Sequence, residues 1–249
     1  MVVYTIGGNP MINLIDYVKA NGNYVLEEKK MNEIDDMIFA RISYMPFKYI
    51  DMCANETIES IATKMKDLEQ AKYIWADDKP FLQELGKAKR YKDIAVTDYV
   101  EILDNSAEKQ FAAITINLPK IKYISYRGTD STLVGWKEDF NMSFMENVPS
   151  QIESVVYLND VAKKYKEDFI LGGHSKGGNL AVYAAVFCED EIKPKIKKSE
   201  QAINACSDLV QEMGLEPTRR LPHAPQTCLS TYSNTLAADL QLDYYSEPG

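Results

Sequence analysis

The sequence is poor in the features that mark metal sites, membrane spans and nucleic-acid binding. Only two histidines occur among its 249 residues, which argues against a histidine-rich metal site. No apolar run is long enough to cross a bilayer, so no transmembrane segment is expected. The net charge of −9 argues against nucleic acid and anionic membranes as partners, because both attract basic surfaces. No basic segment followed by an apolar core opens the sequence, so no secretory signal is expected.

Cysteine is also scarce. The four cysteines lie far apart and form no Cys-x-x-Cys pair, so free thiols in a reducing cytoplasm are the expectation. The scarcity of histidine and cysteine predicts no metal site, and the reaction that the motifs predict needs no organic cofactor. Its apolar fraction of 45% and charged fraction of 26% are typical of a globular protein, and its length allows one substantial α/β domain.

Lysine is absent from the last 51 residues, although the preceding residues contain 23. This change divides the chain into a predicted domain over residues 1–198 and an atypical tail over residues 199–249. The tail has seven acidic and two basic residues. Its pattern predicts a helix over residues 202–213, followed by a loop that contains three prolines.

Helical patterns dominate residues 1–92, because apolar residues recur there every three or four positions. Asn55 is the predicted N-cap of one helix, and Pro80 suits the first turn of another. We expect these helices to form a scaffold. They are predicted over residues 13–21, 32–44, 56–71 and 80–89.

Residues 93–198 carry the alternation of strands and are predicted to form a sheet. Turn chemistry at Asn117–Lys120 joins two of the strands and predicts a hairpin. A capping box from Ser150 to Glu153 begins a helix that is expected to run to Lys166 and lead into a further strand. The predicted strands cover residues 94–96, 99–103, 111–117, 122–126 and 169–171.

The most informative pattern is Gly173-x-Ser175-x-Gly177, which lies between an apolar strand and an alanine-rich helix. Strand, sharp turn and helix are the setting of the nucleophile elbow of serine hydrolases. Glycines are needed beside the serine because the turn leaves no room for Cβ atoms. The turn exposes the Ser175 hydroxyl, and the Lys176 N–H at the helix start is placed to stabilise an oxyanion.

Two other interpretations of this stretch stay open. An ordinary glycine-rich turn can contain a serine without any catalytic role. The run Gly172–Gly178 also has the look of a phosphate-binding loop, but it lacks the Gly-Lys-Ser/Thr order that such loops use.

A second polar segment, Arg127-Gly128-Thr129, follows a predicted strand at the edge where open α/β sheets build their sites. Thr129 has a backbone N–H and a hydroxyl, and both can donate to an oxyanion. It is therefore the predicted second half of the oxyanion hole, although a plain polar turn is the alternative. We expect Arg127 and Asp139 to pair and hold this loop.

These residues bear a family resemblance. Arg127-Gly128-Thr129, Trp136-x-x-Asp139 and Gly173–Asn179 resemble a family of bacterial domains of unknown function, Mbeg-like in name, over about residues 13–198. That family belongs to the α/β-hydrolase superfamily and is similar to the class 3 lipases. The resemblance implies an α/β-hydrolase-like mixed sheet flanked by helices, with an N-terminal helical segment. It also implies Ser175 as nucleophile, with Thr129 and the Lys176 amide as the oxyanion hole.

The last fifth of the chain departs from the family, which continues into a further strand, an acidic loop and a catalytic histidine. Chain order in this fold is serine, acid, histidine, which leaves Asp208 as the candidate acid and His223 as the candidate base. His223 lies in a proline-rich loop, so a surface histidine is the alternative. His174 is expected to be structural, with its side chain directed away from Ser175.

The sequence thus predicts a cytoplasmic serine hydrolase that acts on small-molecule acyl esters, including lipids. The alternative is a catalytically incomplete hydrolase fold, C-terminally truncated or rearranged, that lacks the acid and the base and acts as a binding module. The sequence does not specify an oligomeric state.

Overall fold

The protein is described by a computed structural model. It describes residues 5–6, 9–10, 13–130, 132–142, 145 and 147–201, with the side chains at 5–6, 9–10, 139 and 200–201 left out. The predicted tail helix over residues 202–213, Asp208 and His223 lie outside the described residues.

A six-stranded mixed sheet forms the centre of the molecule, in the order β3-β4-β5-β6-β7-β8. The pairings from β3 to β6 are antiparallel, and β6–β7 and β7–β8 are parallel. This sheet confirms the predicted α/β class. Its strands are β3 Glu56–Thr57, β4 Ala95–Asp104, β5 Lys109–Leu118, β6 Ile121–Tyr126, β7 Asp168–Gly173 and β8 Ile196–Gln201, and a separate pair joins β1 Thr5–Ile6 to β2 Asn9–Pro10.

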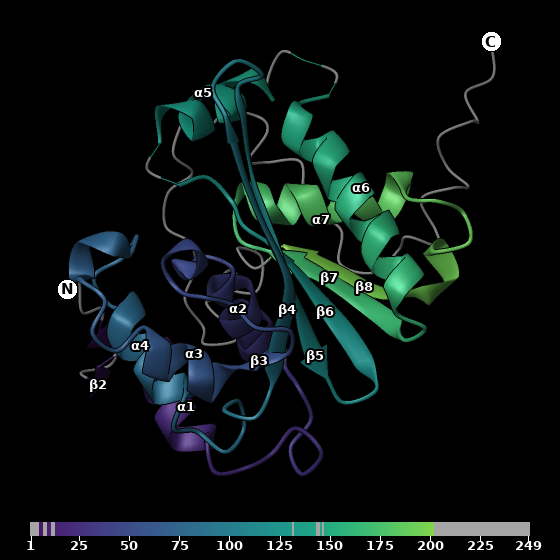
Figure 1. The fold of residues 1–249 in the computed structure, drawn as a ribbon. Coiled ribbons are helices and arrows are strands. Elements are labelled where there is room, and N and C mark those ends of the chain that lie inside the picture. Colours follow the sequence, from purple (N-terminus) through teal and green to yellow (C-terminus); the bar gives the residue numbers. More distant parts are fainter. Residues whose placement is uncertain are drawn as a thin grey trace.

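Helices cover both faces of the sheet (Figure 1). Those before β4 and those after β6 form the two groups. The helices are α1 Leu14–Asn21, α2 Glu33–Ile42, α3 Ile58–Lys64, α4 Asp78–Leu85, α5 Leu133–Asn141, α6 Pro149–Lys164 and α7 Lys176–Phe187, with 3₁₀ turns η1 Phe47–Tyr49, η2 Gln70–Lys72 and η3 Lys193–Lys195.

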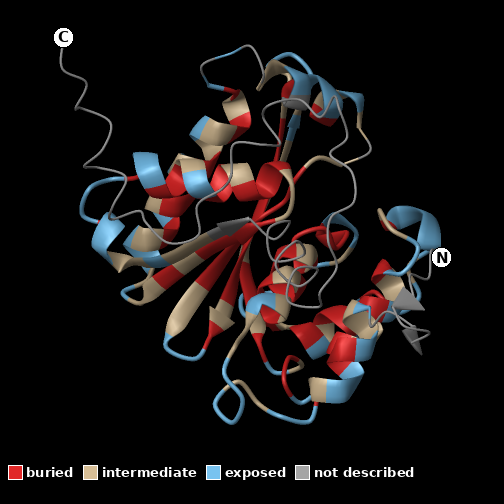
Figure 2. Ribbon diagram, turned by 180° about the vertical axis from the view of Figure 1, so that it is seen from behind, coloured by how far each residue is buried: buried red, intermediate tan, exposed pale blue. Residues whose placement is uncertain are grey.

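The two groups of helices bury opposite faces of the strands. In β5, Ile114 and Ile116 pack with the N-terminal helices, whereas Phe111 and Ala113 pack with α6 and α7. This alternation follows from the two-residue period of a strand. Each fully buried isoleucine or phenylalanine side chain contributes about 1.5–3 kcal/mol to folding. Figure 2 shows the resulting buried sheet between its helical layers.

The predicted hairpin and first two helices are confirmed. β5 and β6 pair antiparallel with Leu118 opposite Ile121, and Asn13 and Asn32 cap α1 and α2. The predicted strands over residues 94–96 and 99–103 form one strand, β4, with a bulge at Asp98.

The predicted cap at Asn55 and the predicted length of its helix are wrong. The N-cap of α3 is Thr57, whose side chain accepts the Ser60 N–H at 3.2 Å, and α3 ends at Lys64. Thr57 pairs with Ala95 of β4, and the Ile58 N–H donates to the Ile94 carbonyl. Pairing with the sheet therefore fixes where the helix begins, and helical spacing does not reveal this.

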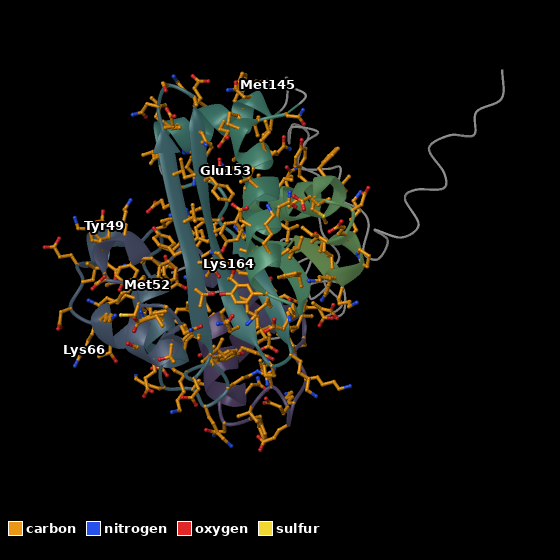
Figure 3. All side chains as sticks on the ribbon, turned by 45° about the vertical axis from the view of Figure 1, so that its right-hand side comes forward. Tyr49, Met52, Lys66, Met145, Glu153 and Lys164 are labelled. Carbon is orange, nitrogen blue, oxygen red and sulfur yellow. The ribbon has the colours of Figure 1, made fainter. Side chains whose placement is uncertain are left out.

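The predicted capping box from Ser150 to Glu153 is also wrong. Val148 is the N-cap of α6, and its N–H donates to the Gln151 side chain at 3.0 Å. Pro149 occupies the first helical position, where its missing N–H costs nothing. Glu153 forms an ion pair with Lys109 of β5 at 2.8 Å. Figure 3 shows Glu153 and Lys164 along α6, beside the long strands.

β8 runs across the boundary predicted between residues 198 and 199 and adds a second parallel pairing to the sheet. None of the helices in the described ranges is both long and apolar enough to span a membrane.

A buried ion pair joins helix α2 to the segment after α4. The side chains of Asp35 and Arg90 are fully buried, and Arg90 Nε donates to Asp35 Oδ1 at 2.9 Å. The Tyr91 hydroxyl donates to the same carboxylate, and Arg90 also donates to the Lys29 carbonyl at 2.7 Å. Removal of either charge would leave the other buried without a counter-ion.

We therefore predict that Asp35→Asn lowers the free energy of unfolding by about 3 kcal/mol, measured by urea denaturation. Asp160→Asn is the control, because Asp160 pairs with Lys163 at 3.4 Å and both side chains are 63% exposed. That variant should change the free energy of unfolding by less than about 1 kcal/mol. Equal losses in the two variants would contradict this account of Asp35.

Candidate active site

The sharp turn at Ser175 has the geometry that the sequence predicts. β7 ends at Gly173, α7 begins at Lys176, and Ser175 between them has φ 58° and ψ −127°. A positive φ is unfavourable for a residue with a Cβ atom and costs on the order of 1–3 kcal/mol. Such strain is typical of functional sites, and the nucleophile elbow places its serine on a turn of this kind.

The glycines beside Ser175 are required by close backbone contacts. A Cβ atom on Gly173 would overlap the carbonyl group of Gly177, and one on Gly177 would overlap the Tyr126 carbonyl oxygen. The last residue of β6 therefore lies against the first turn of α7. Any larger residue at these positions would force the elbow away from the sheet.

The loop after β6 touches the elbow directly. A Cβ atom on Gly128 would overlap the His174 carbonyl oxygen and would lie 3.2 Å from the Gly177 nitrogen. Thr129, half-buried, is the next residue along this loop. The Lys176 N–H belongs to the first residue of α7, where a helix supplies no carbonyl partner of its own. The loop after β6 and the elbow thus touch where Gly128 meets Gly177. The two predicted oxyanion residues are the sequence neighbours of this contact: Thr129 follows Gly128, and Lys176 precedes Gly177.

Tyr44 bridges these two segments. The Gly128 N–H donates to the Tyr44 hydroxyl at 2.9 Å, and that hydroxyl donates to the His174 carbonyl at 3.1 Å. Its side chain is almost completely buried. The sequence does not reveal this role, because an aromatic residue just after an amphipathic helix has the same pattern whether or not its hydroxyl binds a distant loop.

The side chain of Lys176 is buried beneath the elbow. Its Nζ donates to Glu138 Oε2 at 2.9 Å, to Gln110 Oε1 at 2.9 Å and to the Gln110 carbonyl at 3.0 Å. All three ammonium donors are therefore used. The side chains of Lys176 and Glu138 are 2% and 0% exposed. The sequence indicated a role only for the backbone of Lys176.

Glu138 joins this ammonium group to three further elements. Its Oε2 also accepts the Gln110 N–H at 3.0 Å, and its Oε1 accepts the Ser150 N–H at 2.8 Å. Glu138 lies in α5, Gln110 in β5 and Ser150 in α6. One carboxylate thus connects α5, β5 and α6 to the residue that follows Ser175.

Arg127 holds the loop after β6 through two carboxylates among the described side chains. Its Nη2 lies 2.8 Å from Glu101 Oε1 and 3.5 Å from Asp130 Oδ2. Burial alone would raise the pKa of Glu101, but hydrogen bonds from Tyr99 and Arg127 outweigh it and lower that pKa. The side chain of Asp139, the predicted partner, lies outside the described residues.

His174 lies beside a cavity of about 320 Å³. Its ring centroid is 6.0 Å from those of Tyr44 and Trp75, edge to face with both. Burial, and then the positive charge of Arg41, lower the pKa of His174, so its ring is neutral at pH 7. It is the only histidine in the described part of the chain, because His223 lies outside it. Among the described side chains, no group of three or more His, Cys, Asp or Glu is placed to hold a metal ion.

Comparison with known protein families gives a match to part of the chain. Residues 85–202 match the Mbeg1-like family model. The predicted resemblance to this family is confirmed over that segment, which contains β4 to β8, the loop at Thr129 and the elbow. The helices before residue 85, with Tyr44, lie outside the matched segment. No curated protein and no solved structure matches the chain.

The role of Glu138 leads to a stability prediction. Glu138→Gln should lower the free energy of unfolding by about 3 kcal/mol, because the amide group would turn N–H donors toward a backbone N–H and leave Lys176 buried without a counter-charge. Lys137→Gln on the same helix is the control, since Lys137 pairs with Glu108 at 3.3 Å near the surface. The control should change by less than about 1 kcal/mol in the same urea titration. A Glu138→Gln protein as stable as the control would refute the anchoring role.

Proposed function

We propose that this protein is a serine hydrolase of the α/β-hydrolase superfamily, similar to the class 3 lipases, which cleaves acyl esters with Ser175 as nucleophile. The observation that carries the proposal is the strained backbone of Ser175 between β7 and α7, with glycines in close contact on either side. Positive φ also occurs at the turn residues Glu108 and Lys120, but Ser175 combines its φ of 58° with a ψ of −127°, which lies outside the left-handed helical region.

In the proposed reaction, Ser175 Oγ bonds to the ester carbonyl carbon while its proton passes to a general base. The carbonyl oxygen becomes an oxyanion, to which the Lys176 N–H and Thr129 donate. Collapse of this intermediate expels the alcohol, which receives the proton from the base. A water molecule then attacks the carbonyl carbon of the acyl-enzyme through the same two steps, which releases the acid and returns the proton to Ser175.

The base in this proposal is His223, oriented by Asp208. It rests on chain order, in which the acid and then the histidine follow the serine. Without a base, an unactivated hydroxyl would react slower by several powers of ten.

The exposed side chains of helix α5 favour an apolar substrate. We therefore extend the proposal to lipids. The helix begins shortly after Thr129, and a Cβ atom on Gly135 would lie 3.1 Å from Thr129 Cγ2. Along it, Leu133, Trp136 and Phe140 are 72%, 64% and 67% exposed. Exposed apolar groups gathered beside a site are typical of surfaces that meet other apolar molecules. We also propose a cytoplasmic location, consistent with the free thiols of Cys53 and Cys188.

Labelling with a fluorophosphonate tests the nucleophile. The Ser175 oxygen should displace fluoride from phosphorus and add the probe mass to the wild-type protein, whereas Ser175→Ala should stay unlabelled. In His223→Ala, the labelling rate should fall by about a thousandfold or more if His223 is the base. No labelling of the wild type would overturn the hydrolase proposal in favour of a binding module. An unchanged labelling rate in His223→Ala would exclude His223 as the base and leave Ser175 as the nucleophile.

The oxyanion role of Thr129 has a separate test. Thr129→Val keeps the shape and the backbone N–H but removes the hydroxyl, and the labelling rate should fall about a hundredfold. Thr63→Val is the control, because Thr63 is exposed on α3 and should label at the wild-type rate. Equal rates in the two variants would exclude the Thr129 hydroxyl from oxyanion stabilisation.

A further inference from the structure

The cavity beside His174 has no role in the reaction proposed above. It lies outside the ends of β6 and β7, at the edge of the parallel strands where open α/β sheets bind ligands. Its volume of about 320 Å³ is within the range of ligand sites. The side chains that matter for its chemistry are Met37, Arg41, Tyr44, Trp75, Asp77 and His174.

The walls come from two parts of the chain. His174, directly before Ser175, is contributed by the elbow, whereas the other walls belong to the helices and loops before residue 85. Tyr44 also binds the Gly128 loop, so the cavity adjoins both the elbow and the loop that carries Thr129. A ligand in this cavity therefore contacts His174, the residue directly before Ser175, and the remaining walls lie outside the matched family segment.

The charges of the cavity disfavour an anionic ligand. Arg41 Nη2 lies 2.7 Å from both Asp77 Oδ1 and Asp78 Oδ1, so its charge is already compensated. The guanidinium also stacks on Phe81 and Trp75, at 4.7 and 5.4 Å from the ring centroids. With two carboxyl groups against one guanidinium, a carboxylate ligand would meet no unbalanced positive charge. His174 adds none, because its ring is neutral.

The remaining walls favour a flexible apolar chain. Tyr44 and Trp75 form a tilted pair with centroids 4.7 Å apart and present aromatic surface. Met37 adds an unbranched side chain that adapts to the shape of its neighbours. The volume equals that of about ten water molecules at roughly 30 Å³ each, enough for a chain of medium length.

We propose that this cavity binds the apolar acyl chain of the ester that Ser175 attacks. The inference rests on the proposed hydrolase function for the attack itself, but binding of the chain requires no chemistry. The N-terminal helices then act as the selectivity element of the enzyme as well as the cover of one sheet face. A neutral ester should bind better than the corresponding free acid.

Binding can be measured without turnover. The chain has two tryptophans, so Trp136→Phe leaves Trp75 of the cavity as the only tryptophan, which excitation at wavelengths that tyrosine does not absorb selects, and Ser175→Ala prevents reaction. In this double variant, methyl octanoate should change Trp75 emission saturably. Affinity should rise about fourfold per methylene group from methyl butanoate to methyl octanoate. Sodium octanoate should bind at least tenfold more weakly than methyl octanoate.

A matched pair of methionine variants places the ligand. Met37→Phe fills the cavity and should weaken methyl octanoate binding at least tenfold, whereas Met52→Phe should leave it unchanged. Met52 is half-buried as Met37 is, but it lies away from the cavity lining, among the N-terminal elements (Figure 3). Equal affinity in the two variants, or no dependence on chain length, would overturn the proposal.

Hydrolysis of p-nitrophenyl esters links the cavity to the reaction. Met37→Phe should shift the preferred ester from octanoate toward acetate, while Met52→Phe keeps the wild-type preference. An unchanged preference in a protein that a fluorophosphonate labels would overturn the acyl site and leave the hydrolase intact. Saturable ester binding in a protein that resists labelling would do the reverse: the chain-binding cavity would stand, and the hydrolase would fall.

Discussion

The structure of the site depends on the buried ion pair between Lys176 and Glu138. The backbone of Lys176 begins α7 next to Ser175, and its side chain ends in a site with three acceptors. Because both charges are shielded from water, neither has an alternative partner of equal strength. The ion pair thus fixes the distance between α5 and the elbow, and the loop at Thr129 connects directly to α5.

The close backbone contacts at the elbow also fix its position. Gly128, Gly173 and Gly177 allow three segments to approach to distances that side chains would prevent. Tyr44 then fills the space beside them and satisfies a buried N–H and a buried carbonyl with one hydroxyl. Rigid support of this kind would keep Ser175 and Thr129 within the narrow tolerances that the proposed catalysis needs.

Much of this architecture could be predicted from the sequence, because local rules determine it. The strand, sharp turn and helix around Ser175 follow from short-range sterics, and the hairpin between β5 and β6 follows from turn residues. The contributions of Tyr44 and Glu138 could not be predicted, because their partners are distant in the chain. Tyr44 binds the Gly128 N–H 84 positions away, and the partners of Glu138 are at least 12 positions away. The errors at Asn55 and Ser150 have a related cause: pairing with β4 and the proline at 149 override the nearest capping residue.

The bulge at Asp98 has a consequence for how copies of this chain meet. β3 pairs with β4 only at Ala95 and Val96, so a long flank of β4 carries no strand from the described residues beside it. An uninterrupted flank would offer a ladder on which another chain could extend the sheet. Asp98, with φ 52°, breaks the regular spacing of that ladder. The strand therefore resists growth of the sheet from one molecule into the next.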